Sequence, residues 1–193
     1  MKKIDVSELQ GPLTEFMQQM SGENGRKRFE EFKLWQKGVS LLLQPVATVE
    51  VAEVRRLVSR ERLTKANVGW TGDNFKRLLL EKVEENVPAG RIAVDTLVRG
   101  ALDFEIQAAL GRARRVIHLA HFFQLLEKQA KDQAGSLLTN GNWNIAYCFG
   151  SEGNVWAVSA ARGPLDRDWL FGARSVGRPS GWHAGAQVLS QAA

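Results

Sequence analysis

The chain has 193 residues, which is enough for one domain with a packed core. Apolar residues make up 44% and charged residues 24% of it, ordinary globular values that exclude an extended disordered chain. The formal net charge of +5 permits an anionic partner such as nucleic acid. Because Cys148 is the single cysteine, an intrachain disulfide and a cysteine zinc site are excluded.

The beginning of the chain predicts a cytoplasmic protein. Residues 1–9 are polar and lack the apolar run of a signal peptide. The longest apolar runs of the chain are far below the roughly 20 residues of a membrane span. We therefore expect no membrane association.

Two amphipathic helices are expected first, over residues 11–20 and 26–37. The second begins with Arg26, Lys27 and Arg28, where positive charge opposes the helix dipole. An anionic partner would explain these residues, and a solvated helix face is the alternative.

The next segment contains the densest basic run of the chain. Alternating residues from Val46 to Val51 fit a short strand, but the pattern up to Leu63 favours a helix from about Val49. The run consists of Arg55, Arg56, Arg60 and Arg62, followed by Lys65. We predict that these arginines, together with Arg26–Arg28, bind an anion.

Three further helices are expected, over residues 73–86, 92–102 and 112–133. The last has one apolar stripe, and the opposite face carries Arg114, His118 and Lys128 as candidate anion ligands. His118 and His121 have a spacing seen in metal sites. Because no third ligand is placed near them, no metal site is predicted.

The last third predicts short antiparallel strands, marked by tryptophans at intervals of thirteen residues: Trp143, Trp156, Trp169 and Trp182. Folding at the turns 150–153 and 163–166 pairs Tyr147 with Trp156 and Ala160 with Trp169. The first three tryptophans then share one buried face. Trp182, in a looser turn, stays a candidate binding residue.

The stretches LTEFMQQMSGENGRKRFEEFKLWQKG and DNFKRLLLEKV, with the closing tryptophan strands, resemble an uncharacterised family of small bacterial proteins. That family is met mostly in uncultured lineages with reduced genomes. The resemblance implies an aromatic, lysine-rich N-terminal helix and a C-terminal antiparallel sheet. It implies no known activity, cofactor or catalytic residue.

Together these features predict a single α+β domain over residues 1–193. A helical N-terminal two-thirds (1–135) would pack on a C-terminal four-stranded antiparallel meander (136–193). The expected function is non-enzymatic binding of an anionic partner such as nucleic acid, without cofactor or metal. The alternatives are a protein-interaction or regulatory module, and an enzyme with a site between sheet and helices. The oligomeric state is left open.

Overall fold

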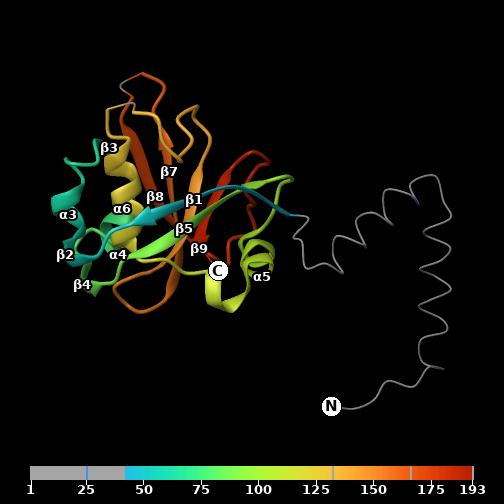
Figure 1. Cartoon of the computed structure of the whole chain (residues 1–193), viewed down its shortest axis with the longest axis horizontal. Helices are drawn as coiled ribbons and strands as arrows, with labels where there is room; N and C mark the ends of the chain where they lie inside the picture. Colours follow the sequence, from blue (N-terminus) through green and yellow to red (C-terminus); the bar gives the residue numbers. More distant parts are fainter. Residues whose placement is uncertain (1–24, 26–41, 132, 166, 193) are drawn as a thin grey trace, which may run out of the picture. The chain divides into compact units, whose positions relative to one another are not determined.

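The computed structural model describes Gly25 and residues 42–131, 133–165 and 167–192. Leu42–Ala193 form one compact unit, and its described part is mostly sheet (Figure 1). The predicted helical N-terminal two-thirds on a four-stranded meander is therefore wrong. The helices expected over 11–20 and 26–37 lie outside the described residues.

The described strands form one seven-stranded and one two-stranded sheet. The order in the large sheet is β1 (Leu43–Val51), β5 (Gly90–Leu97), β9 (Gln187–Gln191), β6 (Asn144–Phe149), β7 (Val155–Arg162), β8 (Trp169–Ser175) and β3 (Val68–Thr71). The small sheet pairs β2 (Val54–Val58) with β4 (Val83–Val87). The helices are α3 (Ser59–Arg62), α4 (Asp73–Leu78), α5 (Asp103–Arg114) and α6 (Leu119–Lys128).

The C-terminal meander exists in part. Strands β6, β7 and β8 pair antiparallel in chain order, as predicted. The fourth predicted strand is present as β9, but it does not extend the meander beyond β8. It lies between β5 and β6, antiparallel to β5 and parallel to β6.

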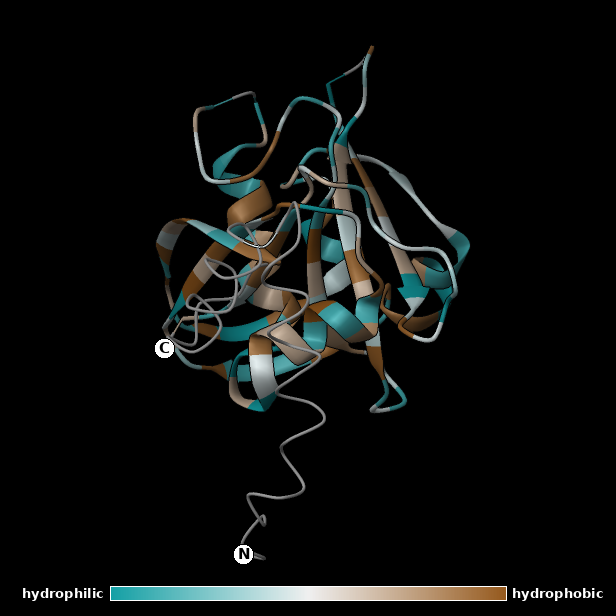
Figure 2. Cartoon of the chain, turned by 90° about the vertical axis from the view of Figure 1, so that its right-hand side faces the viewer, coloured by the Kyte–Doolittle hydropathy of each residue, from teal (hydrophilic) through white to brown (hydrophobic). Residues whose placement is uncertain are grey.

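The central strands β5, β9, β6 and β7 of the large sheet are buried on both faces, and this explains the wrong helix prediction over residues 92–102. Neighbours along a strand enter different cores: Cys148 and Leu189 contact the cluster around α4 and α6, whereas Tyr147 and Val188 contact the cluster around α5. Hydrophobic residues gather along the strands in the middle of the unit (Figure 2). A strand buried on both faces has a continuous apolar sequence, which periodicity does not separate from a buried helix.

The predicted helices are replaced as follows. Residues 49–63 form the end of β1, β2 and α3, so the strand alternative for Val46–Val51 is confirmed. Residues 73–86 contain α4 and most of β4. Of residues 92–102, the first six belong to β5, and the rest follow the end of that strand. The long helix over 112–133 is two elements, the end of α5 and α6.

The predicted tryptophan register is shifted. Trp156 pairs with Cys148 instead of Tyr147, and this slip of one residue exchanges the faces of β6. Trp169 pairs with Arg162 instead of Ala160, a slip of two residues that preserves the face. Trp156 and Trp169 therefore contact one core cluster, whereas Trp143 packs against the other.

None of the described helices has the length and apolar character that a bilayer span requires.

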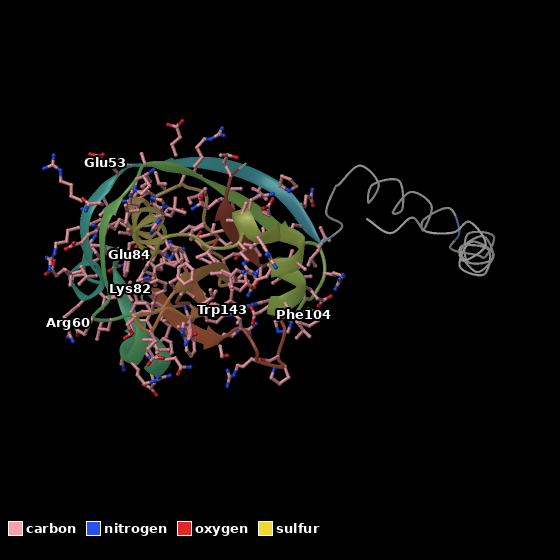
Figure 3. All side chains as sticks on the ribbon, turned by 90° about the horizontal axis from the view of Figure 1, so that it is seen from below. Glu53, Arg60, Lys82, Glu84, Phe104 and Trp143 are labelled. Atoms are coloured by element: carbon pink, nitrogen blue, oxygen red, sulfur yellow. The ribbon has the colours of Figure 1, made fainter. Side chains whose placement is uncertain are left out.

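Helix α6 is fixed at its beginning by a carboxylate from β4. Glu84 accepts hydrogen bonds from the backbone N–H groups of Leu119 (3.2 Å) and Ala120 (2.9 Å). These N–H groups have no partner within the helix, and the dipole favours negative charge there. Lys82 lies 2.8 Å from the same carboxylate (Figure 3). Glu84 therefore both binds the N-terminus of α6 and forms an ion pair with Lys82, whose side chain is nearly buried.

The residues after α6 are held by a buried guanidinium. Arg162, at the end of β7, donates to the backbone carbonyls of Gln129 and Ala130. Its guanidinium also lies 4.2 Å from the centroid of the Trp169 ring. Positive charge is favourable at a helix C-terminus, so Arg162 fixes this end of α6 to the sheet.

A buried polar cluster anchors α5 on the opposite face. Asp103 accepts hydrogen bonds from the Tyr147 hydroxyl (2.9 Å) and the Trp182 indole N–H (2.7 Å), and Arg174 donates to it over 3.2 Å. Arg174 also covers the Trp182 ring at 3.6 Å from its centroid. Burial and the nearby Asp103 carboxylate raise the pKa of Tyr147, so the phenol stays protonated and donates.

The Asp103 cluster predicts a graded loss of stability. Trp182→Phe removes one hydrogen bond to a buried carboxylate, and we expect the free energy of unfolding to fall by about 1–3 kcal/mol. Asp103→Ala leaves the partly buried Arg174 without its carboxylate and should cost about 3–5 kcal/mol. Urea denaturation followed by circular dichroism measures both. Trp70→Phe, at a ring that is 54% exposed, is the control. Equal effects of Trp182→Phe and Trp70→Phe would contradict the role of this hydrogen bond.

His121 predicts a pH dependence of stability. The imidazole is 3% exposed, and its Nε2 lies 3.0 Å from the carbonyl oxygen of Pro88, so the neutral Nε2–H form donates. Burial is the largest cause that lowers the pKa of His121 from its ordinary 6.5. In the window from the lowered folded value up to 6.5, the unfolded chain binds more protons. The free energy of unfolding should therefore fall as pH drops through this window.

His121→Gln should remove this dependence, measured as the difference in unfolding free energy between about pH 7.5 and pH 5.5. His118→Gln, which keeps His121, is the matched control and should retain the drop. The same drop in His121→Gln as in the unsubstituted chain would show that another group causes it.

Candidate anion-binding groove

An open groove of about 540 Å³ lies where three segments of the chain meet. Its walls come from the corner between β1 and β2, from α3 with the residues after it, and from the second half of α6. The lining residues are Glu53, Val54, Arg55, Arg56, Arg62, Lys65, Gln124, Glu127 and Lys128. Five of these are basic and two are acidic, which gives the groove a formal charge of +3. A concave surface with one predominant sign of charge concentrates ions of the opposite sign.

The side chain of Gln124 fixes the corner between β1 and β2 to α6. Its Oε1 accepts a hydrogen bond from the N–H of Ala52 (2.9 Å), and its Nε2 donates to the carbonyl oxygen of Ala52 (2.7 Å). Both backbone groups of Ala52 are satisfied by this amide at the point where β1 ends. Lys128, on the same helix, donates to the carbonyl oxygen of Glu50 over 3.1 Å. The two contacts hold the end of β1 and the corner at Ala52 against α6, beside the groove.

Glu127 holds two cations at the base of the groove. Arg62 donates to both of its carboxylate oxygens, from Nε to Oε1 and from Nη2 to Oε2 (2.7 Å). Lys65 Nζ lies 3.4 Å from Oε2. The Glu127 side chain is 11% exposed, whereas that of Lys65 is 68% exposed. Arg62 is thus fixed in a two-point pair, and the ammonium group of Lys65 reaches solvent.

The arginines of β2 supply the exposed charges. Arg56 faces Glu85 across the small sheet, 3.9 Å away, and both side chains are well exposed. Such a pair contributes about 0–1 kcal/mol and is screened by salt. Within the part of the chain that the structure describes, Arg55 has no carboxylate at ion-pair distance. These two guanidinium groups are therefore available to an anion that enters the groove.

The structure brings together part of the predicted site. Arg55, Arg56 and Arg62 line the groove together with Lys128, which the sequence assigned to a different binding face. Arg60 belongs to the same basic run but pairs with Glu81 at the periphery (Figure 3). The predicted Arg26, Lys27 and Arg28 lie outside the described residues.

Arg114 and His118 lie outside the groove that Lys128 lines. Arg114 connects α5 to the sheet through the carbonyl oxygen of Gln191 (3.0 Å) and the carboxylate of Asp95 (3.3 Å). His118 precedes α6, and its Nδ1 lies 4.0 Å from Glu84. The single helix that would have aligned the three residues is broken between α5 and α6.

Trp182 is buried and hydrogen-bonded within the fold. It is 6% exposed, its backbone pairs with Ala101, and its indole belongs to the Asp103 cluster. A buried indole with a satisfied N–H is not presented to a polymer. The contact with Asp103 of α5 gives Trp182 this buried environment, which the loose turn in the sequence did not reveal.

Five groove residues were absent from the predicted site: Glu53, Val54, Lys65, Gln124 and Glu127. Lys65 closes the same basic run, so its spacing was a usable signal. Glu127 is an acid at the C-terminal end of a helix, where the dipole disfavours negative charge, and this hinted at a cation partner. Gln124 gave no signal, because its role depends on the corner at Ala52.

Guanidinium and ammonium groups from separate elements, converging on one open groove, are suited to bind oxyanions such as phosphate. Comparison of the chain with known protein families, with curated proteins and with solved structures finds no match.

Proposed function

We propose that this chain is a non-enzymatic cytoplasmic binding protein whose groove holds the phosphate backbone of nucleic acid. The observation that carries the proposal is the convergence of five basic side chains from β2, α3 with its following residues, and α6. Lysine and arginine contacts to phosphates provide sequence-independent affinity. They are also the contacts that orient a nucleic acid on a protein.

The cations differ in what they offer to a phosphate. Arg55 and Arg56 present planar groups that can form two parallel hydrogen bonds to one phosphate. Lys65 and Lys128 contribute compact charges on flexible stems. Because these side chains surround an open groove, a polymer can pass along it and contact several of them in turn.

The shape of the groove supports a polymer better than a small ligand. Small-molecule sites enclose most of the surface of their ligand. This groove is open to solvent and lined mostly by long charged side chains. A nucleic acid backbone needs one accessible side only, since its bases can remain in solvent.

A protein-interaction module remains the alternative, and one observation favours it. Phe104, on the outer side of α5, is 66% exposed (Figure 3). An exposed aromatic ring suits a protein interface. Phe104→Ser should leave nucleic acid binding unchanged if the groove is the binding site.

The groove predicts salt-dependent binding of RNA or DNA. Fluorescence anisotropy of a short labelled oligonucleotide should give a dissociation constant of about 1–100 µM at physiological salt, tightening steeply at lower salt. The double variant Arg55→Gln/Arg56→Gln should lower affinity about tenfold at low salt. It should also make the slope of log K against log salt shallower by about two. The reason is that two phosphate contacts are lost.

The control is Arg60→Gln, which removes one arginine charge from the same basic run outside the groove, whereas the double variant removes two inside it. Its affinity should stay within about twofold of the unsubstituted chain, because distant exposed charges are screened. The proposal is falsified if the unsubstituted chain binds neither RNA nor DNA at low salt. An equal loss in Arg60→Gln and in the double variant would assign the binding to net charge instead of the groove.

A further inference from the structure

Glu127 is placed where a carboxylate is unfavourable for the helix. It is the second-last residue of α6, close to the negative end of the helix dipole. Its side chain is 11% exposed, so burial adds to this cost. Both of its oxygens contact cations that line the groove. Its cation partners, Arg62 and Lys65, explain this placement. They are also the residues that would face a bound phosphate.

The contact between Arg62 and Glu127 imitates the contact that a phosphate would make. Arg62 presents its Nε and Nη2 edge to the two oxygens of Glu127. This two-point geometry is the same one that arginine uses for phosphate oxygens. A phosphodiester that enters the base of the groove therefore meets donors already occupied by a carboxylate of like charge.

We propose that Glu127 is a built-in competitor of the nucleic acid backbone and limits how tightly the groove binds it. The inference rests on the proposed function. In the free protein, Glu127 supplies the anion that the partly buried Arg62 requires. When a phosphate arrives, it competes with Glu127 for Lys65 and repels the carboxylate beneath it.

Lys65 is the cation that changes partner. Its ammonium group is 3.4 Å from Glu127, its side chain is largely exposed, and among the described residues this long contact is its one ion pair. Arg62 is 20% exposed and held at two points, so it keeps its pair with Glu127 and turns its remaining N–H groups to the groove. The free and bound forms thus differ in one ion pair, which permits fast release of the polymer.

Glu127→Gln tests this inference, because it removes the charge while keeping an acceptor oxygen for Arg62. The affinity for a short labelled RNA, measured by anisotropy at low salt, should increase about three- to tenfold. The slope of log K against log salt should become steeper by about one. Glu127→Asp, which keeps the net charge but withdraws the carboxylate from Arg62, should increase affinity to a lesser extent. If circular dichroism shows that Glu127→Gln does not fold, the RNA affinity of Glu127→Asp tests the inference instead.

Glu81→Gln is the matched control, since it removes an acid paired with an arginine outside the groove. Its affinity should stay within about twofold of the unsubstituted chain. Unchanged or weaker binding by the folded Glu127 variants overturns the inference while leaving the proposed function intact. An equal gain in Glu81→Gln also overturns it, because net charge would then be the cause. Absence of binding by the unsubstituted chain overturns the proposed function itself.

Discussion

The described structure depends on a sheet whose central strands are covered on both faces. Cys148 and Tyr147 are neighbours in β6, yet they belong to different hydrophobic clusters, and Leu189 and Val188 repeat this arrangement in β9. Helix α6 must lie on one face and α5 on the other to keep both clusters from water. The groove follows from this constraint. It forms where β1 leaves the covered sheet at Ala52 and the end of α6 faces the departing chain.

Sequence reasoning predicted the three antiparallel strands of the meander and failed where the spacing of apolar residues fits a helix as well as a strand. Residues 92–97 fill both clusters, so their pattern fits a helix as well as a central strand. The thirteen-residue tryptophan interval indicated strands and turns correctly. It did not indicate register, because a slip of one residue at Trp156 gives an equally apolar pairing with the wrong face. Distant pairings such as β5 with β9 leave no local signal.

The candidate site was predictable in its charge but not in its shape. Clustering of Arg55, Arg56 and Arg62 is visible in the sequence, and the structure brings them to one groove. Arg60 differs from them because it lies outside the groove, where it pairs with Glu81. Lys128 lines the groove because of the position of α6. This position depends on the long-range hydrogen bonds of Gln124 and Glu84. The position of each element in the fold therefore decides which cations of a basic run face the groove.

The central position of β9 has a consequence for how the protein is made. Strand β5 is synthesised long before its neighbour β9, and β6 also waits for the same strand. Until β9 arrives, apolar β5 has one unpaired edge, which is a template for association with other chains. Contacts between strands far apart in the sequence also form slowly. The nascent chain is therefore most prone to aggregation during the interval between the synthesis of β5 and that of β9.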